Sequence, residues 1–158
     1  MSVNFALPRF SFSDTISALR RRYFLFFLLW VFAELHPGKS LSLSWYIRAI
    51  CQALQQAARG KTQRLVINVP PRHLKSITAS VAFAVWLLGR NPHLKIMIVT
   101  YGGELARQHA DQRRQIMQSL VYRRLLRDTK LGVGGVRQTL LRTTAGGGCR
   151  PVNAEAPL

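Results

Sequence analysis

The chain has 158 residues, of which 48% are hydrophobic, so it is long enough for one domain with a buried core, and wholesale disorder is excluded. It carries 23 lysines and arginines against six acidic residues, which gives a formal net charge of +17. That charge favours polyanionic partners, either nucleic acid or an anionic membrane face, and the few carboxylates leave little scope for metal binding or acid–base catalysis.

The N-terminal part is predicted to contain a long helix that begins at Ser13 or Asp14, either of which can cap it, and continues to about Glu34. Its second half, residues 23–33 (YFLFFLLWVFA), is almost entirely apolar and follows three arginines. Eleven residues are too few to span a bilayer, which needs about 20, and no small-residue cleavage site follows. We therefore predict a helix that is buried or faces a partner, and no membrane role. The alternative of a membrane or export segment rests on residues 20–33 alone.

A second helix is predicted from Ser42 or Ser44 to Gly60, because its apolar residues recur at helical spacing and glycine favours a helix end. Residues 64–69 (RLVINV) follow a basic turn and are nearly continuously apolar, as in a strand buried on both faces of a parallel sheet. These patterns predict that the chain passes from helices into a sheet at about residue 64.

Residues 76–88 (SITASVAFAVWLL) are apolar almost all round, which predicts a buried helix. A second strand is predicted at 95–101 (KIMIVTY), followed by an amphipathic helix over 104–127. The apolar side of that helix includes Leu105, His109, Ile116, Met117, Leu120 and Leu125, and its solvent-exposed side is predicted to carry Arg107, Arg113, Arg114, Arg123 and Arg124. A strand, a helix and a strand joined by short connections indicate a right-handed βαβ unit and a parallel sheet, to which further strands must be added.

Residues 132–158 are rich in Gly, Ala and Pro and have no helical period, which predicts a loop or a disordered tail. We therefore predict an α/β fold in three parts: a helical region over 1–63, a βαβα core over 64–131, and this tail. Cys51 and Cys149 lack CxxC spacing, which argues against a metal site or a disulfide framework and fits a reducing, intracellular setting.

Two Lys-Ser pairs are candidates for a phosphate-binding loop, whose full pattern is G-x-x-x-x-G-K-[ST]. Residues 38–40 (Gly-Lys-Ser) lack a preceding strand and are predicted to form a helix-ending turn. Lys75 and Ser76 instead follow a predicted strand and open a predicted helix, so free amides and the positive end of the helix dipole face the loop. Arg72 adds positive charge, whereas Leu74 replaces the motif glycine and disfavours positive φ. The alternative is a basic turn in an α/β domain.

The segment LVINVPPRHLKS (residues 65–76) resembles the deviant Walker A motif of the large terminase subunit of tailed phages and prophages. That motif usually reads PPRHGKS after a strand of this type. The similarity covers about residues 25–148, including the approach ELHPGKSLSLSWYIRAI, the following strand and helix KIMIVTYGGELARQHADQRRQIMQS, and LLRTTAGGG, which resembles the family's Thr-Thr-Gly-Gly segment. The resemblance implies part of a P-loop NTPase-type fold preceded by helices.

Carried over by position, the resemblance implies that Lys75 contacts the β/γ-phosphates of ATP and that Ser76 holds Mg²⁺. Arg72 would sense phosphate or couple to DNA movement. Trp45 and Tyr46 would lie on the adenine side, with Tyr46 where a His is commonly seen. The loop itself would be shaped by Pro70, Pro71 and His73.

The resemblance also implies an ATPase that drives double-stranded viral DNA into a procapsid in the cytoplasm of a bacterial host. Its partners would be the portal, the small terminase subunit and a homo-oligomeric ring, and a C-terminal nuclease would cut concatemeric DNA. The family's Walker B strand, which ends in paired acids, should follow the Gly-rich segment, but CRPVNAEAPL follows Gly148. We therefore expect a truncated, frameshifted product that does not hydrolyse ATP alone.

A second hypothesis belongs to a different class. The chain would be a small basic module that binds nucleic acid without catalysis, through the arginines of residues 104–127. No recognition motif beyond charge supports sequence-specific reading of DNA. The two hypotheses separate at Lys75, which is essential only to a nucleotide site.

Overall fold

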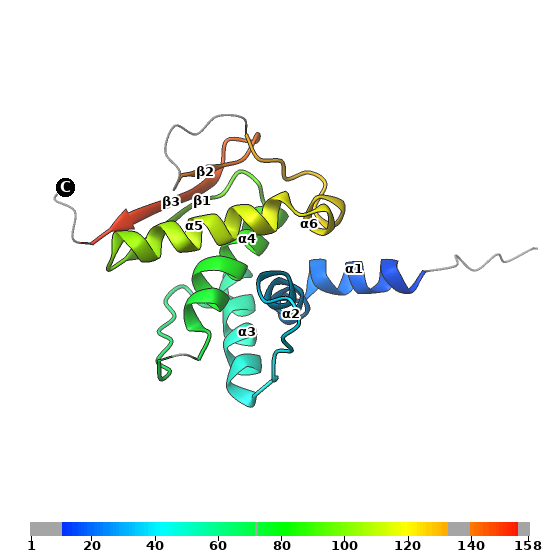
Figure 1. Ribbon diagram of the computed structural model, residues 1–158, viewed down its shortest axis with the longest axis horizontal. Coiled ribbons are helices and arrows are strands. Elements are labelled where there is room, and N and C mark those ends of the chain that lie inside the picture. The colour runs from blue at the N-terminus through cyan, green and yellow to red at the C-terminus, as the bar shows by residue number, and fades with distance from the viewer. Residues whose placement is uncertain (1–10, 72, 133–139, 155–158) are drawn as a thin grey trace, which may run out of the picture.

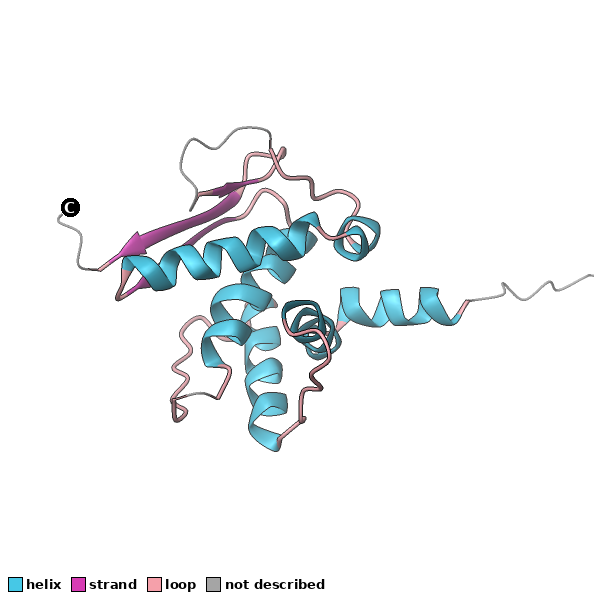
Figure 2. Ribbon diagram, viewed as in Figure 1, coloured by secondary structure: helices cyan, strands magenta, loops and turns pink. Residues whose placement is uncertain are grey.

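The computed structural model describes residues 11–71, 73–132 and 140–154. Within them the chain is mixed α/β, as predicted, with a small three-stranded sheet lying against helices (Figures 1 and 2). The strands are β1 (Lys95–Thr100), β2 (Leu141–Arg142) and β3 (Gly148–Asn153), in the spatial order β1-β3-β2. β3 pairs parallel with β1 and antiparallel with β2, so the sheet is mixed.

The N-terminal region forms two helices where a single one was predicted. α1 (Phe12–Arg22) begins at an N-cap serine, Ser11, and α2 (Phe24–Leu35) follows after an extended residue, Tyr23. The amide of Phe24 donates a hydrogen bond of 2.9 Å to the Gln55 side-chain oxygen. A side chain 31 residues further along the chain therefore satisfies an amide at the start of α2, which a local pattern cannot reveal.

The burial predicted for the apolar run after the three arginines is confirmed. α2 contributes five buried side chains to the core, which are Phe24, Phe27, Leu28, Trp30 and Val31. By contrast, α1 buries none of its residues and extends away from the body of the molecule in Figure 1. Among the described residues, none of the helices combines the length and the apolarity needed to cross a membrane.

The second predicted helix is confirmed as α3 (Trp45–Ala58), which starts after Ser44 and ends before Gly60 at a φ of +74°. The turn predicted at residues 38–40 is also present, with Gly38 at a φ of +77°.

The strand predicted at 64–69 is wrong, because these residues are an irregular segment. Val66 is 91% exposed, whereas Ile67 and Val69 pack against the core. The segment therefore covers the core with one side only. It pairs with none of the described strands, and unpaired backbone is not a strand however apolar its side chains are.

A continuous helical stretch runs from Lys75 to Arg90 and comprises the π-helix η1 (Ile77–Phe83) and α4 (Ala84–Arg90). Its burial was predicted correctly. The helix predicted over 104–127 is instead divided into α5 (Gly103–Gln118) and α6 (Leu120–Leu125). Ser119 adopts an extended conformation between them, and its hydroxyl accepts a hydrogen bond from the Tyr122 amide at 3.2 Å, which makes it the N-cap of α6.

The sheet joins a predicted strand to one that was not predicted. β1 lies where a strand was expected, but its parallel partner is β3, in the segment predicted to be a loop or disordered tail. That prediction is therefore wrong for β2 and β3. β2 pairs only with the first two residues of β3, so beyond them this side of β3 has no partner among the described strands. Pro151 lies in that part of β3, and a sheet tolerates proline at such an edge. Residues 133–139 and 155–158 of the predicted tail lie outside the described residues.

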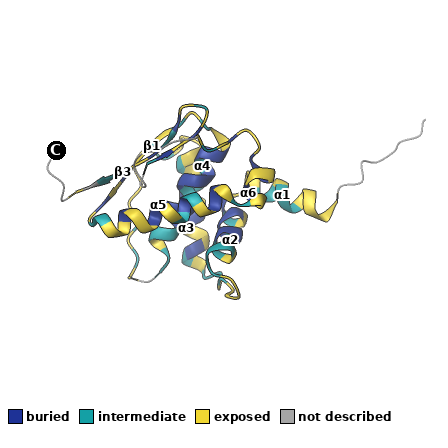
Figure 3. Ribbon diagram, turned by 45° about the horizontal axis from the view of Figure 1, so that its top comes forward, coloured by how far each residue is buried: buried dark blue, intermediate teal, exposed yellow. Residues whose placement is uncertain are grey.

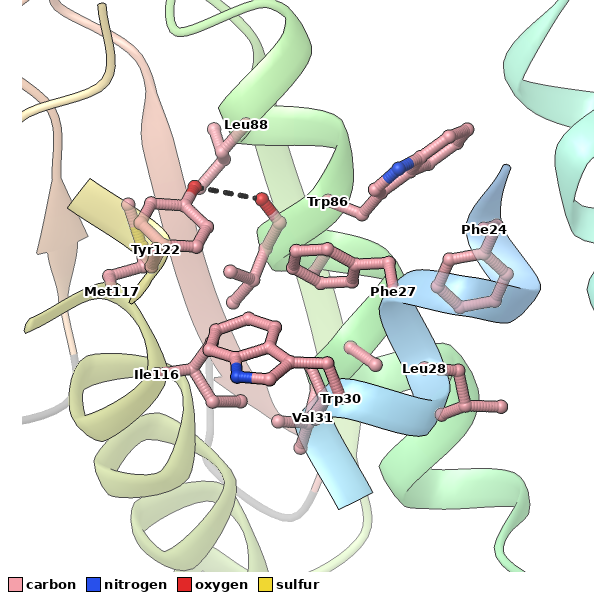
Figure 4. Packing of buried hydrophobic residues seen from close by; sticks show 14 of the residues in the cluster. Phe24, Phe27, Leu28, Trp30, Val31, Trp86, Leu88, Ile116, Met117 and Tyr122 are labelled. Atoms are coloured by element: carbon pink, nitrogen blue, oxygen red, sulfur yellow. Dashed lines mark hydrogen bonds between the residues drawn. The ribbon is translucent and has the colours of Figure 1, made fainter. Parts of the chain in front are cut away.

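The core lies between the sheet and α2, α3, η1, α4 and α5 (Figure 3). Figure 4 shows its aromatic centre, where the Phe24 and Phe27 rings of α2 meet Trp86 of α4 and Tyr122 of α6. The Tyr122 hydroxyl donates a 3.0 Å hydrogen bond to the Val85 carbonyl oxygen, drawn as a dashed line. Burial raises the pKa of this phenol above its ordinary value, so it stays a neutral donor.

Candidate functional site

The predicted phosphate loop lies immediately before the helix that starts at Lys75. Lys75 is exposed, Ser76 is half-buried, and both have helical backbone conformation. The ring nitrogen Nδ1 of His73 lies 2.9 Å from the Pro71 carbonyl oxygen, within hydrogen-bonding distance, which ties the loop to itself. Arg72, the other cation predicted here, lies outside the described residues.

The backbone at Leu74 has a φ of +57°. Among the described residues, no other non-glycine residue has a positive φ. For an L-residue this conformation costs roughly 1–2 kcal/mol. The Leu74 side chain is half-buried and packs against the core, which offsets part of that cost. Leucine therefore occupies the backbone conformation that the sequence led us to consider unfavourable for it.

The start of this helix presents suitable groups for an anion. The Thr78 amide donates to the Leu74 carbonyl oxygen at 2.9 Å and closes the first turn. By helix geometry the amides that precede Thr78 are terminal ones without an intrahelical acceptor. A left-handed residue followed by right-handed ones directs successive amides to one side, an arrangement that binds anions. The Lys75 ammonium and the Ser76 hydroxyl are further donors carried by the first residues of the same helix.

The structure also brings an expected adenine-side residue to the loop. The Tyr46 ring, at the start of α3, lies edge-on to the His73 ring with 5.2 Å between the centroids. Trp45 is the neighbouring aromatic, 6.3 Å from the Tyr46 ring, and is 80% exposed. The two segments are 27 residues apart in the sequence, from position 46 to position 73, so their contact follows from the tertiary structure.

The predicted arginine surface is only partly a surface. Arg107, Arg123 and Arg124 are exposed. Arg114 is half-buried and lies 3.8 Å from the Asp111 carboxylate. Arg113 is fully buried, so its predicted place on the solvent-exposed side of the helix is wrong.

A buried polar cluster on α5 was missed as a feature of the sequence. It consists of His109 and Arg113, both buried, together with the half-buried Gln112, and each has a side-chain atom without a hydrogen-bond partner in the described part of the chain. The sequence contains a signal for this cluster, because the i, i+4, i+7 spacing of positions 109, 113 and 116 places His109 and Arg113 on the helix face of the buried Ile116. That spacing indicates a buried Arg113, whereas its charge favours solvent.

The segment at residues 143–148 (TTAGGG) has a clear packing role. The Thr143 hydroxyl donates to the Pro92 carbonyl oxygen at 2.6 Å, and the Gly148 amide donates to the Leu94 carbonyl oxygen at 2.8 Å. Gly147 lies directly against the backbone of residues 92–94. The segment therefore holds the start of β3 against the loop that leads into β1.

No protein-family model matches the chain, and neither a curated protein nor a solved structure matches it significantly. The candidate site therefore rests on the loop geometry described above and on the resemblance of its sequence. Within residues 11–71, 73–132 and 140–154, the structure contains no cluster of three or more His, Cys, Asp or Glu side chains placed to hold a metal ion.

Proposed function

We propose that the loop at residues 70–76 binds the phosphates of a nucleotide, as the ATPase module of a terminase large subunit does. In this proposal the chain is part of a P-loop NTPase-type fold, although residues 64–69 before the loop are irregular in this structure, and it contacts double-stranded DNA through its basic surface. Lys75 binds the phosphate oxygens and Ser76 contributes a hydroxyl to a bound Mg²⁺. In that family, hydrolysis of the β–γ phosphoanhydride bond of Mg²⁺-bound ATP drives DNA movement.

The backbone of Leu74 is the observation that carries the proposal. Positive φ is the conformation for which glycine is normally required, and Leu74 stands where the resembled motif PPRHGKS has its glycine. The loop thus keeps a glycine-like backbone without the glycine. A basic turn without a ligand does not require a strained residue at this position. The strain at Leu74 therefore supports a role for this conformation in directing backbone amides toward a phosphate.

The surroundings of the loop add a second support. Tyr46 and His73 are in ring contact, so an aromatic surface lies beside the phosphate-binding groups. The exposed Trp45 widens that surface. A nucleotide with its phosphates at Lys75 has aromatic rings within the same region on which a base can stack. We assign the adenine side of the site to these rings as part of the proposal.

Replacing Lys75 by Ala is expected to weaken binding of Mg²⁺–ATP and of pyrophosphate by about 10- to 100-fold, because a charge-assisted hydrogen bond to phosphate is lost. The measurement is the dissociation constant of each ligand by titration calorimetry on the full chain. Lys75 is exposed, so the variant should melt within about 2 °C of the wild type.

The matched control is Lys61→Ala, which removes the same charge from another exposed lysine. It should leave the affinity for Mg²⁺–ATP unchanged within about twofold. Equal, small losses in the two variants would contradict the proposal and would favour the basic nucleic-acid-binding module instead. That module has support of its own in the exposed Arg107, Arg123 and Arg124 and the net charge of +17.

The backbone at residue 74 provides an independent prediction. Leu74→Gly keeps positive φ accessible and should retain or improve binding of Mg²⁺–ATP. Leu74→Val places a β-branched residue at the same φ and should weaken that binding by at least about fivefold, since the left-handed conformation becomes less accessible. Affinities of the two variants, measured with their melting temperatures, test this. Identical affinities in both would sink the link between this conformation and phosphate binding.

A further inference from the structure

One face of the sheet is open to solvent. Along β1 the side chains of Ile98 and Thr100 are buried, and α5 packs against the sheet (Figure 1). Met97 and Val99 alternate with them and are 68% and 61% exposed. Successive residues of a strand point to opposite faces, so these two lie on the face away from the core. Tyr101 follows the strand, continues the alternation and is 78% exposed.

The register of the sheet places cations beside these apolar side chains. Arg150 of β3 is the partner of Met97, and the preceding row joins Lys95 to Gly148 and Gly148 to Arg142 of β2. Partner residues in neighbouring strands point to the same face. The side chains of this open face are all exposed, and they belong to Lys95, Met97, Val99, Tyr101, Arg142 and Arg150. The open face is therefore basic where β1 begins and aromatic where β1 ends.

The cations of the open face have no counter-ion in the described part of the chain. Lys95, Arg142 and Arg150 form no ion pair with a described residue, and the described acids all lie outside the strands of the sheet. A partner that fits this face brings negative charge together with surfaces that pack on apolar and aromatic side chains. A second copy of this chain does not fit, because it presents the same cations and a net charge of +17.

A single-stranded nucleic acid has both properties. Its phosphates are anionic, and its unpaired bases have flat faces that stack on aromatic side chains. In a duplex those faces are already stacked on one another. Residues 95–101 span roughly 20 Å at the rise of a strand, which gives room for a few nucleotides.

We infer that the open face binds single-stranded nucleic acid, with a base stacked on Tyr101 and phosphates paired with the exposed cations of the three strands. This inference goes beyond the nucleotide site proposed above, because it uses none of the residues of the phosphate loop. It also differs from binding through the arginines of α5 and α6. Charge alone attracts a duplex as well as a single strand, whereas stacking requires unpaired bases.

The experiment measures the affinity of the full chain for a fluorescein-labelled oligothymidylate of about 12 nucleotides, by fluorescence anisotropy at several salt concentrations. Tyr101→Ala should weaken binding at least about fivefold, because a stacked base is lost. The slope of log affinity against log salt should stay unchanged, since no charge is removed. Tyr101→Phe keeps the ring and should stay within about twofold of the wild type.

A charge variant tests the phosphate contacts separately. Arg150→Gln should make the salt dependence of binding shallower by about 0.7 in slope, the contribution of one phosphate contact on a single strand. Its matched control is Arg59→Gln, which removes an exposed arginine at the end of α3 and should leave that slope unchanged. Equal changes of slope in the two variants would contradict a role of the sheet in binding phosphates.

The control for the aromatic ring is Phe12→Ala. Phe12 is 81% exposed on α1, which extends away from the body of the molecule in Figure 1. Its loss should leave the affinity for the oligothymidylate within about twofold of the wild type. The inference is overturned if Tyr101→Ala and Phe12→Ala bind the single strand equally well.

Two further ligands distinguish other partners of the open face. Tyr101→Ala should not change the affinity for the corresponding thymidylate–adenylate duplex, and an equal loss with duplex and single strand would overturn the inference. Loss of binding to anionic phospholipid vesicles alone would also overturn it and would assign the open face to a membrane surface. If Tyr101→Ala does not fold, the ring resonances of Tyr101 in the wild type decide. They should shift with the single strand and stay unchanged with the duplex.

Discussion

Gly147→Ala is expected to destabilise the fold by about 3 kcal/mol or more, because the added methyl group meets backbone atoms and not a flexible side chain. A Cβ at this position would lie 2.5 Å from the Leu94 carbonyl oxygen and 2.6 Å from the His93 carbonyl carbon. Accommodating it moves β3 away from the loop that leads into β1 and lengthens the hydrogen bond from the Gly148 amide to Leu94. The measurement is urea unfolding followed by circular dichroism.

Gly102→Ala is the matched control for this variant. A Cβ at Gly102 has nothing within 4 Å, and the residue has an extended backbone conformation. Its free energy of unfolding should stay within about 0.5 kcal/mol of the wild type. If the two glycine variants are equally stable, the contact between residues 92–94 and the segment at residues 143–148 does not hold the sheet together.

Trp86→Ala is expected to lower the free energy of unfolding by about 3–5 kcal/mol, the usual range for a buried tryptophan. The Trp86 ring is 1% exposed, lies 5.4 Å from the Phe24 ring, and carries the Arg90 guanidinium 4.7 Å above it. Its Nε1 also donates to the Arg20 carbonyl oxygen at 3.3 Å. Trp86 therefore joins α4 to both N-terminal helices, and its loss removes packing together with a hydrogen bond.

The chain contains its own control in Trp45. Trp45→Ala removes the same side chain from an 80% exposed position at the start of α3, and its free energy of unfolding should stay within about 0.5 kcal/mol of the wild type. Thermal melts of both variants measure the difference. A stability loss in Trp45→Ala as large as in Trp86→Ala would mean that the N-terminal helices are not organised around α4. Under the proposed function, Trp45→Ala weakens nucleotide affinity without affecting stability.

Local patterns in the sequence were sufficient for most helices and for β1. A serine before an apolar period and a glycine after it predicted α3, because capping and left-handed termination are properties of a few adjacent residues. The apolar run in α2 and the apolar helix from Lys75 to Arg90 were predicted to be buried, since their side chains are almost wholly hydrophobic. The Lys75–Ser76 helix start also follows from the sequence.

Helix breaks required information from elsewhere in the chain. The break at Tyr23 places the Phe24 amide against Gln55, a residue of another helix. The break at Ser119 uses a serine that a helix interior also tolerates, so its role as a cap depends on where α6 packs. In both places the local preference is weak, and tertiary contacts of about 1 kcal/mol decide between continuing and ending a helix.

The sequence by itself determined which segments are helical and buried, and it located the loop whose residues could bind phosphate. The tertiary structure alone decided the strand pairing, because residues 64–69 have the stronger strand composition but no partner, whereas Gly148–Asn153 has a partner in β1. It also decided the burial of Arg113 and the positive φ of Leu74. The physical reason is the same in each case: pairing, desolvation and strain are properties of what lies around a residue, and a sequence pattern records only the residue's neighbours along the chain.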